Sequence, residues 1–199
     1  MKRAFLAIPI ALLACTGFAN PPDDKAIESL GLPSRVASKP EQELLEGAAE
    51  FNLAELELAA IGKGSGDPHV RALAGRLEQN HQALQPVLEQ MARRKGVTLP
   101  TAPSAKQSQR LEELRKKQPR DFNPLFLKTA VQFHQEALQL FQKNAPLIDD
   151  PALRTFAGQL QKGAQVNLER IQATPLAPVA EPPRRRWKRS GWAPRPAGD

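Results

Sequence analysis

The chain has 199 residues, of which 41% are hydrophobic and 25% are charged, and it contains 19 prolines, one cysteine and no tyrosine. This length indicates one domain with terminal extensions, and a single cysteine excludes an internal disulfide framework and any CxxC metal or redox site. The formal net charge of +7 comes from the two ends, because residues 20–181 hold 20 basic and 20 acidic side chains. A neutral central segment argues against a nucleic-acid-binding domain, which carries its basic charge on the folded surface.

Residues 1–19 have the pattern of a secretory signal peptide. Lys2 and Arg3 precede an apolar run over residues 4–14, which is too short to span a membrane and is followed by small residues. Two processing sites compete: cleavage before Asn20, or a lipobox-like segment ending at Cys15, which would then be lipidated. We therefore expect a periplasmic or secreted protein, with an outer-membrane lipoprotein anchored at Cys15 as the alternative.

Residues 20–37, rich in turn-forming residues, are predicted to be a disordered tether, and residues 38–174 show helical patterns throughout. Capping and proline signals predict five helices, over residues 38–62, 67–95, 104–117, 123–145 and 150–174. Pro86 should kink the second helix, and Asn123 followed by Pro124 should start the fourth.

The lengths of the connections predict the fold. The first two helices and the last two are joined by short loops, so each pair should form an antiparallel hairpin. The connection over residues 97–122 is long enough to run back along the bundle. We expect an all-α, ferritin-like four-helix bundle in which two antiparallel hairpins are joined by a long crossover containing a short helix. A simple up-and-down bundle is the alternative.

Each of the four long helices carries one polar residue in its apolar stripe. These residues are Glu55, His81, His134 and Asn167. A buried polar group must find partners, so the four are predicted to form a core polar network that fixes the register of the bundle.

A weaker hypothesis is a metal site made by Glu55, Glu78, His81 and His134. A di-iron centre requires two Glu-x-x-His motifs, and only Glu78 to His81 provides one. Counted from the first loop, Glu55 and His81 should differ in level by roughly 10 Å, which also argues against a shared site. We expect no cofactor, with a single Zn, Cu or Fe ion as the alternative.

The order of several short motifs resembles a bacterial secreted ferritin-like family of unknown function whose members are commonly called outer membrane proteins. The matching segments are Ala54-Glu55, residues 74–81, Gly96-Val97-Thr98-Leu99-Pro100 and residues 133–141. The chain departs from this family at Asn80, where an aspartate is usual, and at Asn167, where a third histidine is usual. The resemblance implies a ferritin-like bundle outside the cytoplasm and no reaction.

Residues 175–199 form a Pro/Arg/Trp-rich segment that is predicted to be disordered. Its candidate residues for binding an anionic surface are Arg184, Arg185, Arg186, Trp187, Lys188, Arg189 and Trp192. Basic residues approach anionic lipid and indoles settle among headgroups, so an anionic membrane or envelope surface is the expected partner, and nucleic acid is not. A solvated tail without a partner is the alternative.

These observations favour a non-enzymatic, exported cell-envelope protein with no catalytic residues. A role in envelope stress is implied by the family resemblance alone, and surface association is suggested by the basic C-terminal segment. The alternative function is a metal-binding or metal-dependent redox protein with a partial carboxylate and histidine site in the bundle core.

Overall fold

The computed structural model describes residues 36–177, and these residues form helices and loops without a β-strand. The helices are α2 (Lys39–Gly62), α3 (Pro68–Lys95), α4 (Ala105–Arg115), α5 (Pro119–Asn144) and α6 (Pro151–Gln172), with a 3₁₀ turn, η1 (Ala145–Leu147), after α5. The predicted signal peptide, most of the tether and residues 178–199 lie outside the described residues. No helix within residues 36–177 combines the length and apolar character needed to cross a bilayer.

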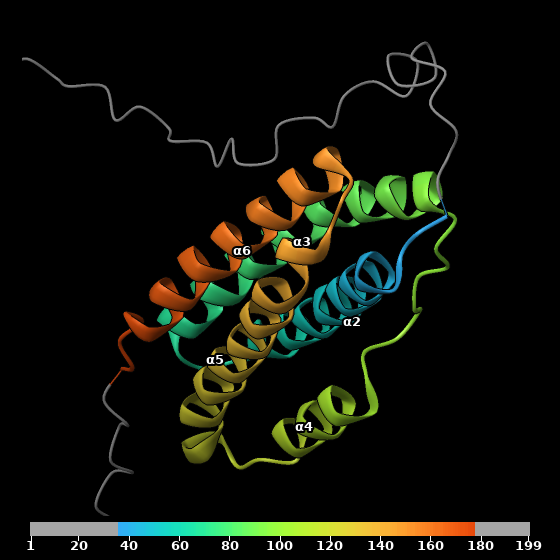
Figure 1. Cartoon of the computed structure of the whole chain (residues 1–199). Helices are drawn as coiled ribbons and strands as arrows, with labels where there is room; N and C mark the ends of the chain where they lie inside the picture. The colour runs from blue at the N-terminus through green and yellow to red at the C-terminus, as the bar shows by residue number, and fades with distance from the viewer. Residues whose placement is uncertain (1–35, 178–199) are drawn as a thin grey trace, which may run out of the picture.

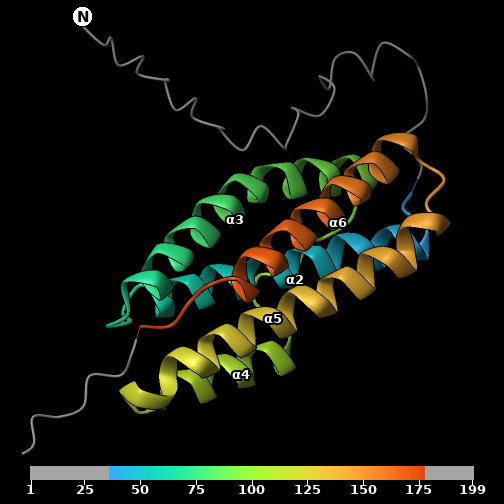
Figure 2. The same cartoon turned by 90° about the vertical axis from the view of Figure 1, so that its left-hand side faces the viewer.

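The four long helices form the predicted bundle (Figure 1). α2 and α3 make one antiparallel hairpin, α5 and α6 make the other, and the two hairpins meet mainly where α2 packs against α5. The crossover between them contains α4, which covers the edges of α2 and α5 (Figure 2). The chain therefore has the expected ferritin-like arrangement rather than an up-and-down order.

Capping explains most helix boundaries. Ser38 and Glu41 form the predicted capping box at the start of α2, and the carboxylates of Asp67 and Asp150 accept backbone N–H groups in the first turns of α3 and α6. α3 ends at Gly96, whose φ of 64° lies in the left-handed region that glycine tolerates best. Pro86 lies inside α3, and Figure 2 shows this helix bending along its length.

The predicted start of the fourth helix, at Asn123, is wrong. α5 begins at Pro119, so Pro124 lies inside the helix, and the only backbone bond it removes is one to the exposed first turn. The Asn123 side chain does not cap the helix, because its Oδ1 accepts the Ser65 hydroxyl at 2.7 Å. Pro119 provides the first-turn proline instead, five residues earlier in the sequence, although its N-cap residue Gln118 makes no side-chain cap hydrogen bond.

The core is predominantly apolar. Phe126, Phe133 and Phe141 of α5 are completely buried, as are Leu111 and Leu114, by which α4 attaches to the bundle. Gly62 is required at the end of α2, because a Cβ atom there would collide with the Phe126 ring. The centre of this core contains the three polar side chains considered next.

Candidate metal centre

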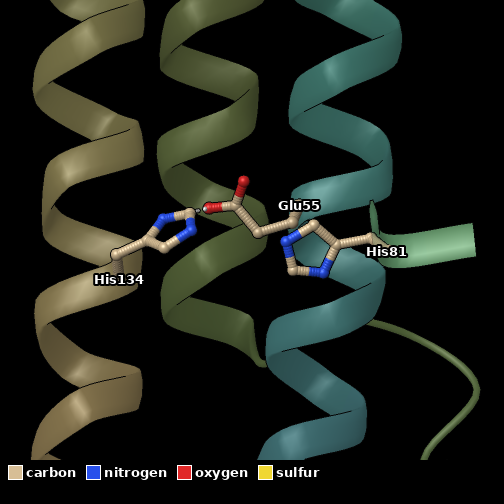
Figure 3. A group of neighbouring side chains, drawn as sticks. All are labelled: Glu55, His81 and His134. Atoms are coloured by element: carbon tan, nitrogen blue, oxygen red, sulfur yellow. Dashed lines mark ion pairs between the residues drawn. The ribbon is translucent and has the colours of Figure 1, made fainter. Parts of the chain in front are cut away.

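Glu55, His81 and His134 come from α2, α3 and α5 and meet in the interior of the bundle (Figure 3). Glu55 and His134 are completely buried and His81 is 3% exposed. One potential ligand atom from each side chain lies within 4.8 Å of the others, and Figure 3 shows all three side chains pointing toward one another. Two imidazoles and one carboxylate are thus gathered from residues up to 79 positions apart in the chain.

The expected difference in level between Glu55 and His81 is wrong. Gly62, the last residue of α2, lies beside Ala74, because a Cβ at Gly62 would stand 2.9 Å from the Ala74 Cβ. The first turn and a half of α3 therefore extends beyond the end of α2. Glu55 precedes Gly62 by seven residues, and His81 follows Ala74 by seven residues. Glu55 and His81 therefore lie at the same level along the bundle axis.

The orientation of His134 is set by two oxygen atoms. Its Nδ1 lies 3.0 Å from the backbone carbonyl of Ala130 and 3.2 Å from Oε1 of Glu55. A single N–H cannot be aligned with both acceptors, and the better-aligned bond goes to Ala130, which leaves Glu55 an electrostatic contact. Burial tends to lower the pKa of His134, but the charge of Glu55 and the contacts of Nδ1 outweigh it, so this pKa is raised.

The orientation of His81 is set by a chain of hydrogen bonds that reaches the surface. The exposed Glu89 carboxylate can only accept, so it fixes the Gln85 amide, which donates to it at 2.9 Å. Gln85 then accepts from the Asn52 amide at 2.7 Å. Asn52 is left with its Oδ1 facing the His81 Nδ1 at 2.9 Å, so Nδ1 of His81 is the donor. His81 therefore keeps the lone pair of its Nε2.

The surroundings keep His81 uncharged. Burial, together with the neighbouring charge of His134, lowers the pKa of His81 to about 3. The Phe51 ring lies edge-on to both imidazoles, with centroid distances of 5.2 Å to His81 and 5.1 Å to His134. An uncharged imidazole with a fixed tautomer is the form in which histidine binds metal ions.

Four buried polar atoms of this cluster have no hydrogen-bond partner among the described residues. They are Oε1 and Oε2 of Glu55, Nε2 of His81 and Nε2 of His134. Native interiors satisfy nearly all buried polar groups, so a concentration of exceptions at one point calls for an explanation.

A metal ion fits this donor set. Ligands about 2.1 Å from a tetrahedral zinc ion lie roughly 3.4 Å apart, so the three ligand atoms, which lie within 4.8 Å of one another, would approach each other by at most about 1.4 Å. A bound ion would be held by the Glu55 carboxylate and the two imidazoles. It would supply positive charge to satisfy the orphaned lone pairs and would join α2, α3 and α5.

The other predicted site residues lie elsewhere. Glu78 forms an ion pair with Lys63 at 2.6 Å near the surface and is not part of the cluster. Asn167 accepts a hydrogen bond from Asn80 at 3.1 Å and does not join the three central residues in the expected network.

Cys15 and the seven candidate residues between Arg184 and Trp192 lie outside the described residues. The hydrogen bond between Asn52 and His81 was not among the predicted contacts. The sequence contained one indication of this contact. Asn52 precedes Glu55 by three residues, about one helical turn, so both side chains lie on the same face of α2.

Comparison with known proteins identifies a family whose description assigns it no function. The model of a family described as a domain of unknown function (DUF4142) matches residues 32–174. No curated protein matches the chain.

Two solved structures are similar in fold. A crystal structure of a DUF305 fragment from Deinococcus radiodurans matches with a TM-score of 0.60 and 18% identity, over 69% of this chain and 95% of that one. A conserved hypothetical protein, rv2844, from Mycobacterium tuberculosis matches with a TM-score of 0.52 and 18% identity, over 72% of this chain and 96% of that one. At such identity the similarity extends to the helical fold alone.

Proposed function

Because the chain belongs to the DUF4142 family, whose description assigns no function, we propose a function from the site itself: the protein binds one divalent transition-metal ion through Glu55, His81 and His134. The observation that carries the proposal is the set of four orphaned polar atoms on these three buried side chains. A purely structural network would leave few such atoms, since each costs about 1–3 kcal/mol when unsatisfied.

The chemistry of the donors narrows the choice of ion. Two imidazoles and one carboxylate suit Zn²⁺ and Fe²⁺, and this ligand set is the one that non-haem Fe²⁺ sites use with further positions open. The cluster contains no thiolate or thioether, the ligands that select Cu⁺. We therefore favour Zn²⁺ or Fe²⁺ over Cu⁺.

The hydrogen bonds around the cluster support metal binding. Metal-binding histidines usually donate their other ring N–H to a carbonyl or carboxylate, which fixes the tautomer and the ring orientation. His134 does so through Ala130 and His81 does so through Asn52. His81 therefore has the lone pair of its Nε2 available, and His134 offers its own Nε2 once metal binding displaces the proton of the imidazolium.

We also propose, on the sequence alone, that the protein acts outside the cytoplasm, in the cell envelope. The support is the signal-peptide pattern of residues 1–19 and the resemblance to a family of exported proteins. In this proposal the metal would be bound in the envelope, and the site is assigned no reaction or substrate.

The deciding experiment is metal analysis of protein purified without a histidine tag. We expect close to one equivalent of Zn or Fe, or one equivalent taken up when apo-protein is titrated with Zn²⁺, or with Fe²⁺ without oxygen. Binding should raise the melting temperature, because an ion that binds only the folded state stabilises it.

The controls come from the chain itself. His81→Gln, His134→Gln and Glu55→Gln should each abolish stoichiometric binding. His69→Gln changes the only other histidine, which is exposed in the first turn of α3, and should leave binding unchanged. Glu78→Gln is the matched control for the carboxylate, since Glu78 pairs with Lys63. Binding that persists in the cluster variants, or is absent from the wild type, contradicts the proposal.

A further inference from the structure

We propose that the end of the bundle where α5 begins is a docking face for an anionic lipid bilayer. This inference is independent of the metal centre. It depends on the distribution of exposed charge and on the place where the described chain ends.

The connection between α4 and α5 provides exposed positive charge. Four of the six residues 115–120 are Lys or Arg. Lys116 and Lys117 are exposed and form no ion pair with another described residue. The Arg120 side chain is 79% exposed and has only a long contact, of 3.4 Å, with Asp121. In contrast, Arg115 is paired with Glu57 and Glu112.

The C-terminal end of the described chain is held at this same end of the bundle. The Ala177 backbone N–H donates to Oδ2 of Asp67 at 2.7 Å, which fixes residue 177 against the loop between α2 and α3. Leu176 and Ala177 line one open hollow, of about 670 Å³, together with Lys117 and Arg120. The described chain thus ends at the basic end of the bundle (Figure 2).

The sequence after residue 177 adds charge of the same sign. Residues 182–199 contain six Lys or Arg, one acidic residue and the indoles of Trp187 and Trp192. This second basic segment, about 60 residues further along the sequence, follows the point where the described chain ends. A partner that attracts both segments is anionic, and indoles settle at the headgroup level of a bilayer. Leu176, which is 39% exposed, adds an apolar contact at this face.

The test uses the chain from Asn20 onward, so that the apolar residues 4–14 cannot bind lipid by themselves. Partitioning is measured by co-sedimentation with vesicles that contain phosphatidylglycerol, and with vesicles of phosphatidylcholine alone. Lys116→Gln/Lys117→Gln is compared with Lys39→Gln/Lys143→Gln. Lys39 and Lys143 are exposed and both approach Glu43, so the second variant loses the same charge away from the basic end.

We expect binding to phosphatidylglycerol that added salt weakens, and little binding to phosphatidylcholine. A basic residue close to an anionic membrane contributes about fivefold in affinity, so the Lys116 and Lys117 variant should bind roughly 25-fold more weakly. The Lys39 and Lys143 variant should bind nearly as the wild type does. Arg184→Gln/Arg185→Gln/Arg186→Gln should weaken binding further when combined with the first variant.

Three outcomes would overturn the proposal. An equal loss in both lysine variants would mean that net charge, rather than this face, governs binding. No loss in the Lys116 and Lys117 variant would assign binding to the C-terminal segment alone. Binding to an anionic oligonucleotide or to a protein in preference to phosphatidylglycerol vesicles would mean that the face serves a different partner.

Discussion

Asn52 and His81 are joined by a hydrogen bond of 2.9 Å between Oδ1 and Nδ1, and this bond determines which nitrogen of His81 is left for a metal. The polarity of the bond originates outside the core, at the exposed carboxylate of Glu89, and passes through Gln85 to Asn52. A surface group thus fixes the tautomer of a buried imidazole.

Asn52→Ala should weaken Zn²⁺ binding by about 10- to 100-fold, because the second partner of a metal-binding histidine contributes that much to affinity. The measurement is competition with a chelator of known affinity. Asn80→Ala is the matched control, since Asn80 precedes His81 directly but hydrogen-bonds Asn167. Equal affinities in wild type and Asn52→Ala would show that the bond does not position His81.

Glu55 and His134 should contribute more to the affinity for a metal ion than to the unfolding free energy of the metal-free protein. In metal-free protein, Glu55→Met leaves His134 buried without its carboxylate and should cost about 3 kcal/mol of unfolding free energy. Glu55→Met/His134→Leu removes both partners and should recover most of this loss, because apolar replacements of a buried pair are often neutral. Urea denaturation of the four members of this cycle provides the measurement.

The same cycle with saturating Zn²⁺ should separate the wild type from the double variant. Only the wild type should gain stability from the ion, so it should become the most stable of the four proteins. A double variant as unstable as Glu55→Met in the absence of metal would indicate that the pair supports the fold itself.

The sequence predicted the bundle because local signals and the global fold agree. The capping box at Ser38 and the aspartates before α3 and α6 are short-range signals, and the apolar stripes repeat at helical spacing. The start of α5 was misplaced because Pro119 and Pro124 are both valid first-turn prolines. Only the packing of α4 against α2 and α5 selects between them.

The site was only partly predictable. The stripes correctly placed Glu55, His81 and His134 on inward faces, but their levels depend on how far α3 extends past α2, which the loop sequence does not specify. Asn167 lies on an inward face as well, yet α3 and α6 touch little, and its nearest partner is Asn80. Helical periodicity gives the direction of a side chain, whereas its partners depend on tertiary packing.

The two buried histidines should respond to pH in opposite ways in metal-free protein. The folded pKa of His81 is lowered to about 3, so the unfolded chain binds a proton that the folded chain does not. His81 therefore lowers stability as the pH falls from about 6.5 toward 3, by roughly 1 kcal/mol per pH unit. His81→Leu should remove this loss from the pH profile of the unfolding free energy.

His134 should give the opposite sign. Despite its burial, the pKa of His134 is raised by Glu55 in the folded protein. The pairing therefore contributes its full stabilisation at a pH below the pKa of His134 in the unfolded chain, and this contribution is lost as the pH rises through the pKa of His134 in the folded protein. His134→Leu should therefore lose more stability, relative to the wild type, at mildly acidic than at alkaline pH. Parallel profiles for the wild type and both variants would contradict these assignments.

Lys95 joins three helices at the end of the bundle opposite the basic face. It is 8% exposed, and its Nζ lies 3.1 Å from Oε1 of Glu41 and 2.6 Å from Oδ2 of Asp150, the N-cap of α6. Burial tends to raise the pKa of both carboxyl groups. Backbone hydrogen bonds and the charge of Lys95 outweigh burial and leave both pKa values lowered.

Lys95→Met should therefore destabilise the protein by about 3 kcal/mol at neutral pH, because it leaves two carboxylates facing each other without their cation. Groups with lowered pKa values stabilise the fold above their unfolded pKa and lose this contribution as the pH falls through the folded values. The difference in unfolding free energy between wild type and Lys95→Met should thus shrink below about pH 4.

Lys106→Met is the control. Lys106 pairs with Glu136 at 2.8 Å but is 68% exposed, so its replacement should cost less than about 1 kcal/mol of unfolding free energy. Thermal or urea denaturation measures both losses. Equal losses of unfolding free energy in the two variants would mean that the buried ion pairs of Lys95 stabilise the protein no more than the exposed ion pair of Lys106.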